Sequence, residues 1–138
     1  MDDRGRLSIP SCLRDELGEE FHVTLAATRS VTQSKHKHLV AYSKANWGLM
    51  NEKYKAMTKT KKMQMRPIFS HASKCDLDSQ GRILISQDLR EWAGFRKNIT
   101  VVGDGECVEF WDSEEWAVVD ALETTVDNIL DIYAENDF

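Results

Sequence analysis

The chain contains nearly the same sequence motif twice. Residues 2–9 read Asp-Asp-Arg-Gly-Arg-Leu-Ser-Ile, and residues 78–85 read Asp-Ser-Gln-Gly-Arg-Ile-Leu-Ile. The likeness extends over residues 2–25 and 78–101, where the identical pairs are Asp2/Asp78, Gly5/Gly81, Arg6/Arg82, Ile9/Ile85, Leu13/Leu89, Arg14/Arg90, Gly18/Gly94 and Thr24/Thr100. A unit of this length is too short to bury a core alone, so two copies predict one domain built by pseudo-twofold packing.

The two copies do not start alike. A strand pattern at residues 73–77 precedes the second copy of the motif, whereas the first copy begins directly after Met1. The symmetry therefore leads us to expect a further strand, of roughly eight residues, ahead of Asp2. The sequence does not contain it, and an unpaired strand edge is a liability for a sheet.

Both copies continue with the same series of predicted elements. A tight turn leads to a short helix, a strand, a closing strand and a longer helix. The predicted short helices are 10–18 and 86–94, the strands 21–26 and 98–102, the closing strands 39–42 and 107–111, and the longer helices begin at Ser43 and Asp112. The first copy also contains an insertion of about seven residues within Thr28–His38, which we expect to form a mobile basic loop.

Three local patterns refine the longer helices. Residues 112–115, Asp-Ser-Glu-Glu, predict a capping box at the start of the last helix. An apolar stripe at helical spacing follows, made of Trp116, Val119, Leu122, Val126, Ile129 and Tyr133. This stripe favours a helix that faces the core, with a partner helix as the alternative. Pro67 is expected to end or kink a helix that runs through the basic connector 59–66.

Charge is distributed unevenly along the chain. Residues 1–75 contain 14 Lys and Arg against 7 Asp and Glu, whereas residues 76–138 contain 4 against 16. The basic half predicts a polyanionic partner, and the acidic end of one subunit could attract the basic end of the next. A dipolar surface without a partner is the alternative interpretation.

Other classes of protein find little support in the sequence. No apolar run reaches the ~20 residues that span a bilayer, and the N-terminus does not resemble a signal peptide. The cysteines Cys12, Cys75 and Cys107 are scattered without CxxC spacing, so we expect no disulfide framework, no zinc site and a reducing cytoplasm.

Catalytic and metal sites are equally unsupported. The histidines at 22, 36, 38 and 71 have no carboxylate or cysteine at a recognised ligand spacing. No motif provides Cys12 with a base, and no phosphate loop, paired acid motif or Ser-His-Asp signature occurs. We therefore expect no enzyme activity, no cofactor and no small-molecule substrate.

The candidate binding residues of the repeated motif are in its Asp-x-x-Gly-Arg unit. The aspartate of a tight turn accepts backbone N–H groups, and glycine adopts a conformation that other residues avoid. Asp2, Gly5, Asp78 and Gly81 are the residues expected to shape the turns. The arginine after each glycine is thereby projected from a rigid hairpin, where its planar fork suits a phosphate or the edge of guanine. An internal Asp–Arg salt bridge is the alternative, and it is compatible with DNA binding.

These motifs resemble the MraZ family of bacterial transcriptional regulators. The resemblance is carried by residues 2–18, 70–85 and 108–112 and extends over nearly the whole chain. It implies an α+β, β-rich fold: a pseudo-twofold barrel of two AbrB/SpoVT-type swapped-hairpin repeats, each followed by helices. The expected division is 1–46 for the first repeat without its leading strand, 47–71 for a helical connector, 72–116 for the second repeat, and 117–138 for an amphipathic helix with an acidic tail.

The resemblance also implies a function. A member of this family would be a DNA-binding regulator, expected to be a repressor, of the division and cell-wall gene cluster. It would act on the nucleoid, form a closed homo-oligomeric ring and recognise short G-rich direct repeats. The residues expected to contact DNA are Arg4, Arg6, Arg14 and Arg82. The first hairpin is expected to serve mainly DNA binding and the second mainly assembly. An antitoxin-type interaction module, with its acidic tail on a protein partner, is the alternative.

Overall fold

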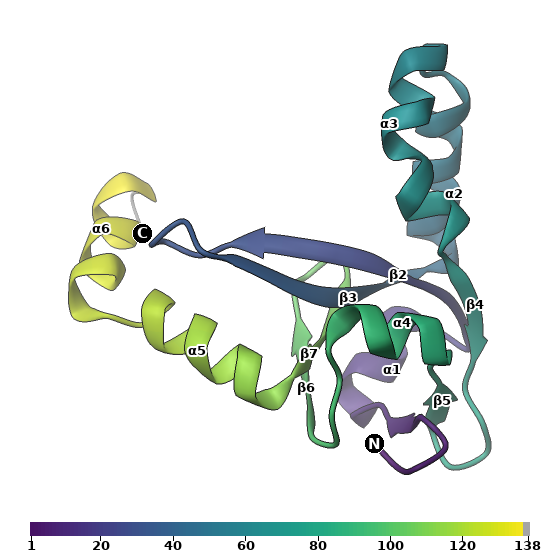
Figure 1. Ribbon diagram of the computed structural model, residues 1–138, viewed down its shortest axis with the longest axis horizontal. Coiled ribbons are helices and arrows are strands. Elements are labelled where there is room, and N and C mark those ends of the chain that lie inside the picture. Colours follow the sequence, from purple (N-terminus) through teal and green to yellow (C-terminus); the bar gives the residue numbers. More distant parts are fainter. Residues whose placement is uncertain (137–138) are drawn as a thin grey trace.

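The computed structural model describes residues 1–136 as an α+β structure with open antiparallel sheets (Figure 1). The elements in chain order are β1 (Arg6–Ser8), α1 (Ser11–Leu17), β2 (Glu20–Arg29), β3 (Lys35–Ser43), α2 (Lys44–Lys55), α3 (Lys59–Ser70), β4 (Ser73–Asp76), β5 (Arg82–Leu84), α4 (Gln87–Ala93), β6 (Ile99–Gly103), β7 (Val108–Asp112), α5 (Ser113–Glu123) and α6 (Val126–Asn136). No helix within residues 1–136 is long and apolar enough to cross a membrane.

The strands confirm the predicted pseudo-twofold arrangement. The five-stranded sheet has the order β4-β2-β3-β7-β6, and its central pair joins the closing strands of the two repeats, β3 and β7. A separate two-stranded sheet pairs β1 of the first repeat with β5 of the second. Because strands of one repeat pair with strands of the other in both sheets, neither repeat forms a separate domain.

The α+β class is confirmed, but the sheets do not close into the barrel that the resemblance implied. In the larger sheet β4 and β6 lie at opposite edges and do not pair with each other. A barrel removes its edges only when the first and last strands pair. Strand β4 covers the outer edge of β2, but no strand among the described residues lies at the corresponding place beside β6.

The core lies between the larger sheet, the short helices and the two-stranded sheet. The short helix of each repeat ends at a glycine with positive φ, Gly18 or Gly94, as the sequence predicts. The largest fully buried side chains of this core are Ile9, Phe21, Val23, Leu39, Ile83, Ile85, Val108 and Phe110. They come from both repeats, so the two copies bury one shared core.

The predicted mobile basic loop is instead the end of a long β-hairpin. Strands β2 and β3 stay paired out to Arg29 and Lys35, so only a short turn lies outside the ladder. His36 and His38 are buried rather than free: His36 bonds Glu115 of α5 through its Nδ1, and His38 stacks on Trp111 at 4.1 Å. Alternation along β3 turns both histidines toward the second repeat, and this contact holds the insertion in place.

The first helical arm, α2 and α3, differs from the prediction at Pro67. Helix α3 continues past Pro67 to Ser70, and the helical break comes earlier, where the Thr58 side chain accepts a hydrogen bond from the N–H of Lys61. Pro67 removes the hydrogen bond to the carbonyl group of Met63. Both residues are exposed, so water can solvate that carbonyl group without ending the helix.

The second helical arm, α5 and α6, corrects two further predictions. The Asp112 carboxylate does not cap α5, because it accepts the backbone N–H of Arg96 at 3.0 Å. The apolar stripe is not one helix facing the core: α5 ends at Glu123, and a new helix begins after Thr125, whose Oγ1 accepts the N–H of Asn128. Val119 of the stripe is buried, but no residue of α6 within the described chain is.

Candidate nucleic-acid interface

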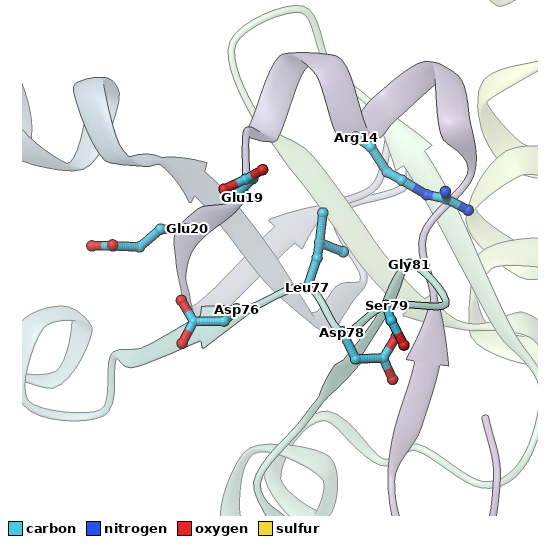
Figure 2. Close-up of a pocket in the computed structure, with 8 residues that line it drawn as sticks. All are labelled: Arg14, Glu19, Glu20, Asp76, Leu77, Asp78, Ser79 and Gly81. Carbon is cyan, nitrogen blue, oxygen red and sulfur yellow. The ribbon is translucent and has the colours of Figure 1, made fainter.

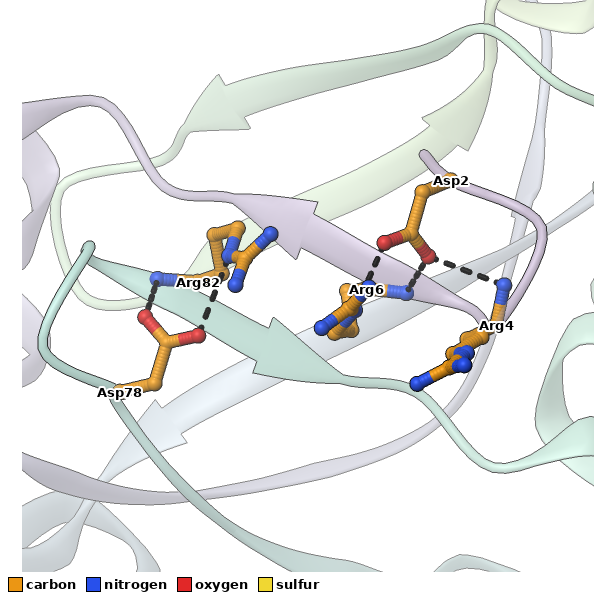
Figure 3. Close-up of polar contacts among 5 residues, drawn as sticks. All are labelled: Asp2, Arg4, Arg6, Asp78 and Arg82. Atoms are coloured by element: carbon orange, nitrogen blue, oxygen red, sulfur yellow. Dashed lines mark hydrogen bonds and ion pairs between the residues drawn. The ribbon is translucent and has the colours of Figure 1, made fainter.

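The pair β1–β5 forms a short ribbon on the outside of the core. Its register places Arg6 opposite Leu84 and Ser8 opposite Arg82. The residues between them, Leu7 and Ile83, are buried. Because side chains alternate along a strand, both arginines are directed to the same outer face of the ribbon (Figure 3).

Each turn before the ribbon is built around its aspartate. Asp2 Oδ1 accepts the backbone N–H groups of Arg4 at 3.0 Å and Arg6 at 2.9 Å, and Asp2 Oδ2 accepts Arg6 Nε at 2.7 Å (Figure 3). The backbone N–H of Gly5 also donates to the Asp2 carbonyl at 3.1 Å. The carboxylate thus fixes both the shape of the first turn and the direction of its arginine.

The second turn repeats the arrangement. Asp78 Oδ1 accepts the N–H groups of Gln80 at 2.8 Å and Arg82 at 2.9 Å, and Asp78 Oδ2 accepts Arg82 Nε at 3.1 Å. The hydrogen bond from the backbone of Arg82 is the main factor that lowers the pKa of the Asp78 carboxyl, and Arg6 has the same effect on Asp2. The internal Asp–Arg salt bridge, the alternative from the sequence, is therefore present in both turns.

The salt bridges leave part of each arginine available. Arg6 and Arg82 use only Nε, and within residues 1–136 neither donates a hydrogen bond from its Nη nitrogens to the protein. An arginine fork that is held at Nε and open at Nη can still pair with the O6 and N7 atoms of guanine or with a phosphate. The aspartates orient these side chains without occupying them.

Arg4 and Arg14 lie in different surroundings. Arg4 is exposed at the first turn, where the second turn has Gln80. Arg14 donates from Nε to the carbonyl oxygen of Ile9 at 2.7 Å, and its guanidinium lies against Gly81. A contact of Arg14 with DNA stays a prediction, whereas its hydrogen bond ties α1 to the start of its own repeat.

The contact of Arg14 with Gly81 has a symmetric counterpart that the sequence reasoning missed. Arg90 donates from Nε to the Ile85 carbonyl oxygen at 3.0 Å, and its guanidinium lies against Gly5. Each arginine thus covers the turn glycine of the other repeat. The identity of Arg14 and Arg90 in the repeat alignment was the available signal, but it does not say which turn each arginine contacts.

Two more residues on the outer face of the ribbon were not predicted. Ser8 lies opposite Arg82, and Leu84, which lies opposite Arg6, exposes 61% of its surface. The signal that could have found them is the strand alternation itself, because Leu7 and Ile83 are the inward residues. A hydroxyl group and an exposed aliphatic side chain are both groups that contact base edges in DNA grooves.

The surroundings of the two turns differ in charge. Beside the second turn lies a pocket of about 540 Å³ lined by Arg14, Glu19, Glu20, Asp76, Leu77, Asp78, Ser79 and Gly81 (Figure 2). The corresponding pocket beside the first turn is lined by Met1, Asp3, Gln87, Arg90, Glu91, Phe95 and Arg96. The first turn therefore faces more cationic surroundings, and a phosphate would be repelled more strongly beside the second.

The aspartate turns predict a particular response to acid. A carboxyl group whose pKa is lowered by folding stabilises the folded protein at any pH above the pKa of the unfolded chain, here 3.8. This contribution to stability disappears as the pH falls through the lower pKa of the folded state. We expect the wild-type free energy of unfolding to fall from about pH 5 to about pH 2, and Asp78→Asn to show a smaller fall because one such carboxyl is gone. Urea unfolding at several pH values measures both.

The control for this prediction is Asp3→Asn. Asp3 lies in the equivalent first turn, where Asp2 accepts the hydrogen bonds and Asp3 makes none among the described residues. An acid profile of Asp78→Asn that matches those of wild type and Asp3→Asn would show that the turn carboxylate does not contribute in this way.

Comparison with known proteins places this geometry in a family. The family model described as "MraZ protein, putative antitoxin-like" matches residues 1–66 and 68–123, one match for each repeat. The chain belongs to the MraZ family. It is 40% identical to the transcriptional regulator MraZ of Alkaliphilus oremlandii over 119 residues, which cover 84% of this chain and 78% of the relative.

Two further MraZ relatives agree. The transcriptional regulator MraZ of Caldicellulosiruptor bescii is 36% identical over 119 residues, covering 84% of this chain and 78% of the relative. That of Heliobacterium modesticaldum is 38% identical over 120 residues, covering 85% and 78%. Membership of the MraZ family makes transcriptional regulation the class of function that the chain shares with these relatives.

Proposed function

We propose that the chain is a sequence-specific DNA-binding regulator that reads DNA with the β1–β5 ribbon. The observation that carries the proposal is the outer face of this ribbon, where Arg6 and Arg82 are each held at Nε by an aspartate and open at Nη. A two-stranded antiparallel ribbon fits the major groove of B-DNA, where each base pair presents its own pattern of donors and acceptors.

The proposed reading of the groove follows from the side chains on this face. Arginine paired with guanine is the commonest specific contact, which supports recognition of short G-rich repeats by Arg6 and Arg82. Leu84 would contact a thymine methyl group, and Ser8 would bond a base or a phosphate. Arg4, which is exposed beside the ribbon, would contact the phosphate backbone, as would Arg14.

The two hairpins are proposed to contribute unequally. The first turn has Arg4 and the more cationic surroundings, whereas the second has Gln80 and a pocket rich in carboxylates. This difference supports a first hairpin used mainly for DNA and a second used mainly for assembly.

The cellular role is the finer part of the proposal. The chain would repress the division and cell-wall gene cluster by occupying promoter repeats on the nucleoid, in the cytoplasm. Several copies would assemble into a ring, and each would place one ribbon on successive direct repeats. Binding of linked copies to linked sites raises avidity without any new contact. Family membership and the open Arg forks support this role.

The decisive experiment is the loss of one arginine. Sequences selected from random DNA by the wild-type chain provide the specific duplex, and a scrambled duplex provides the reference. Arg6→Ala should lower the ratio of specific to scrambled affinity by about five- to 150-fold for each site bound, because one bidentate contact discriminates by ~1–3 kcal/mol. Fluorescence anisotropy at one fixed salt concentration measures the ratio.

Arg29→Ala is the matched control, because Arg29 is exposed at the far end of β2 and its loss removes the same charge. Arg29→Ala should lower both affinities together or not at all. If Arg6→Ala behaves like Arg29→Ala, the assignment of base reading to Arg6 is wrong.

An antitoxin-type module is the second candidate function. It is favoured by α6, which exposes Val126 and Leu130 among acidic side chains. Under this alternative, the chain would neutralise a toxic product of an adjacent gene, and a chain ending at residue 124 would fail to do so while still binding DNA. Co-expression growth assays with both versions distinguish the two functions.

A further inference from the structure

A hydroxyl group, an imidazole ring and a carboxylate meet where the β2–β3 hairpin contacts α5. Ser34 and His36 are two positions apart at the start of β3, so strand alternation directs their side chains to the same side of the sheet. On that side His36 contacts Glu115 in the first turn of α5. The hairpin thus brings three reactive groups together from distant parts of the chain, outside the proposed DNA-reading ribbon.

These three groups are hydrogen-bonded in the order hydroxyl, imidazole, carboxylate. Ser34 Oγ lies 2.8 Å from Nε2 of His36, and Nδ1 of the same ring is bonded to Oε1 of Glu115. Because a carboxylate only accepts hydrogen bonds, a neutral His36 ring carries its proton on Nδ1. Nε2 is then free to accept the hydrogen bond of the Ser34 hydroxyl group. A histidine removes the proton of a nucleophilic serine in this arrangement, which is recognised by its geometry and not by sequence position.

Burial differs between the two ends of this hydrogen-bonded chain. The His36 side chain is buried, whereas Ser34 is exposed on the hairpin. The base is therefore shielded from water, while the hydroxyl group beside it is open to a reagent from solution. His38 on the same face bonds Glu109 at 3.1 Å, but its Nδ1 has no hydrogen-bond partner. Among the histidines of residues 1–136, His36 alone links a carboxylate to a hydroxyl group.

Two further features of the turn favour reactivity at Ser34. Oγ of the buried Ser30 lies 2.6 Å from Ser34 Oγ and 2.9 Å from Oγ1 of Thr32. Since the Ser34 proton is directed to His36, Ser30 can donate to Ser34 Oγ and stabilise the negative charge that develops when this oxygen loses its proton. Gln33, directly before Ser34, has φ +70°, the only positive value among the described residues other than glycine. Backbone conformations of this kind cluster at functional sites.

We propose that Ser34 is a modification site, which accepts the acyl group of an activated carboxylic ester. Ser34 Oγ attacks the carbonyl carbon of the ester while its proton passes to Nε2 of His36. The bond from that carbon to the leaving alcohol then breaks, and the alcohol takes the proton from His36. Glu115 is a positioning residue, because it keeps Nε2 unprotonated in the resting ring and stabilises the protonated ring. An acylated Ser34 no longer donates to His36, so the modification acts on the contact between the inserted hairpin and α5.

Labelling with a fluorophosphonate tests the proposal, because this reagent bonds to a serine oxygen that a neighbouring base activates, with release of fluoride. Mass spectrometry of the digested chain locates and quantifies the label. The wild type should be labelled at Ser34 and not at Ser79, an exposed serine without a histidine partner among the described residues. Incubation with 4-nitrophenyl acetate should place an acetyl group on Ser34, and Ser34→Ala should remove both modifications.

Variants of the carboxylate separate activation from a structural role. Glu115→Gln keeps the size of the side chain and its capacity for hydrogen bonding, but it removes the negative charge that stabilises the protonated ring. It should slow labelling of Ser34 at least ~100-fold, the lower end of the contribution of a general base. Glu115→Asp restores a carboxylate and should label faster than Glu115→Gln. Glu114→Gln removes the same charge from the adjacent residue and is the matched control, which should label like wild type.

Four results would overturn the proposal. They are a wild-type Ser34 that labels no faster than Ser79, equal labelling of wild type and Glu115→Gln, an equal loss in Glu114→Gln, and a Glu115→Asp variant as slow as Glu115→Gln. Each would show that the hydrogen bonds around His36 are only structural. Circular dichroism checks the fold of every variant. If Glu115→Gln does not fold, the comparison of Ser34 with Ser79 in the wild type decides.

Discussion

Replacing Gly5 by alanine is expected to destabilise the protein by about 2–5 kcal/mol, a large fraction of the total stability of most domains. Gly5 has φ +82°, and an added Cβ would lie 2.7 Å from Cζ of Arg90 and 2.9 Å from the carbonyl oxygen of Ile85. The backbone conformation costs an L-residue about 1–2 kcal/mol, and overpacking adds about 1–3 kcal/mol. Urea unfolding followed by circular dichroism measures the change.

Gly94→Ala is the control for the backbone cost alone. Gly94 has φ +70°, but an added Cβ would meet no atom within 4 Å. We expect a loss of only about 1–2 kcal/mol there. Equal losses at Gly5 and Gly94 would show that the close approach of Arg90 and Ile85 carries no energetic weight.

The symmetric glycine offers a sharper test of the crossed arginines. A Cβ on Gly81 would lie 2.4 Å from Cζ of Arg14, and its three nearest neighbours are all atoms of that side chain. In an Arg14→Ala background the cost of Gly81→Ala should therefore fall, because its three nearest contacts are gone. In an Arg90→Ala background, Gly5→Ala should still destabilise the protein more than Gly94→Ala does, because the added Cβ would still meet the Ile85 carbonyl oxygen.

Trp111→Ala is expected to destabilise the protein by about 3–5 kcal/mol. Trp111 is 1% exposed, stacks on His38 at 4.1 Å and donates from Nε1 to Glu109 at 3.1 Å. Its loss would leave a cavity and remove a contact that fixes the inserted hairpin to β7. The free energy of unfolding from urea titrations is the measurement.

Trp92→Ala is the matched control, because Trp92 is only partly buried at the rim of the core. It should cost clearly less, since surrounding groups and water can occupy the space. A Trp111→Ala variant as stable as Trp92→Ala would mean that the His38–Trp111 stack is not a structural anchor.

The repeat made the centre of the fold predictable from the sequence. Identical residues at the Asp2 and Asp78 turns encode a local conformation, and local hydrogen bonds suffice to form it. Capping glycines such as Gly94 and the alternation around Leu7 are likewise local signals. The family, the α+β class and the turn aspartates followed from such patterns, as did the arginines that the ribbon presents.

The errors occurred where distant residues decide the outcome. The basic composition around His36 and His38 indicated a loop, but Glu115 and Trp111 bind these histidines from the other repeat. The apolar stripe indicated one helix, but side-chain hydrogen bonds of the threonines at 124 and 125 divide it. The crossed contact of Arg14 with Gly81 depends on how two repeats meet, which no single stretch of sequence specifies.

The interleaving of the two repeats also sets an order of events during synthesis on the ribosome. Strand β1 is made among the first residues of the chain, but its pairing partner β5 ends at Leu84. The ribbon therefore cannot form until β5 in the second repeat has been synthesised. The pairing of β3 with β7 can form only later, because β7 follows β5 in the chain. A prematurely terminated chain would contain Arg4 and Arg6 but no ribbon to present them, so under the proposed mode of DNA reading incomplete products would not compete with the finished protein for DNA.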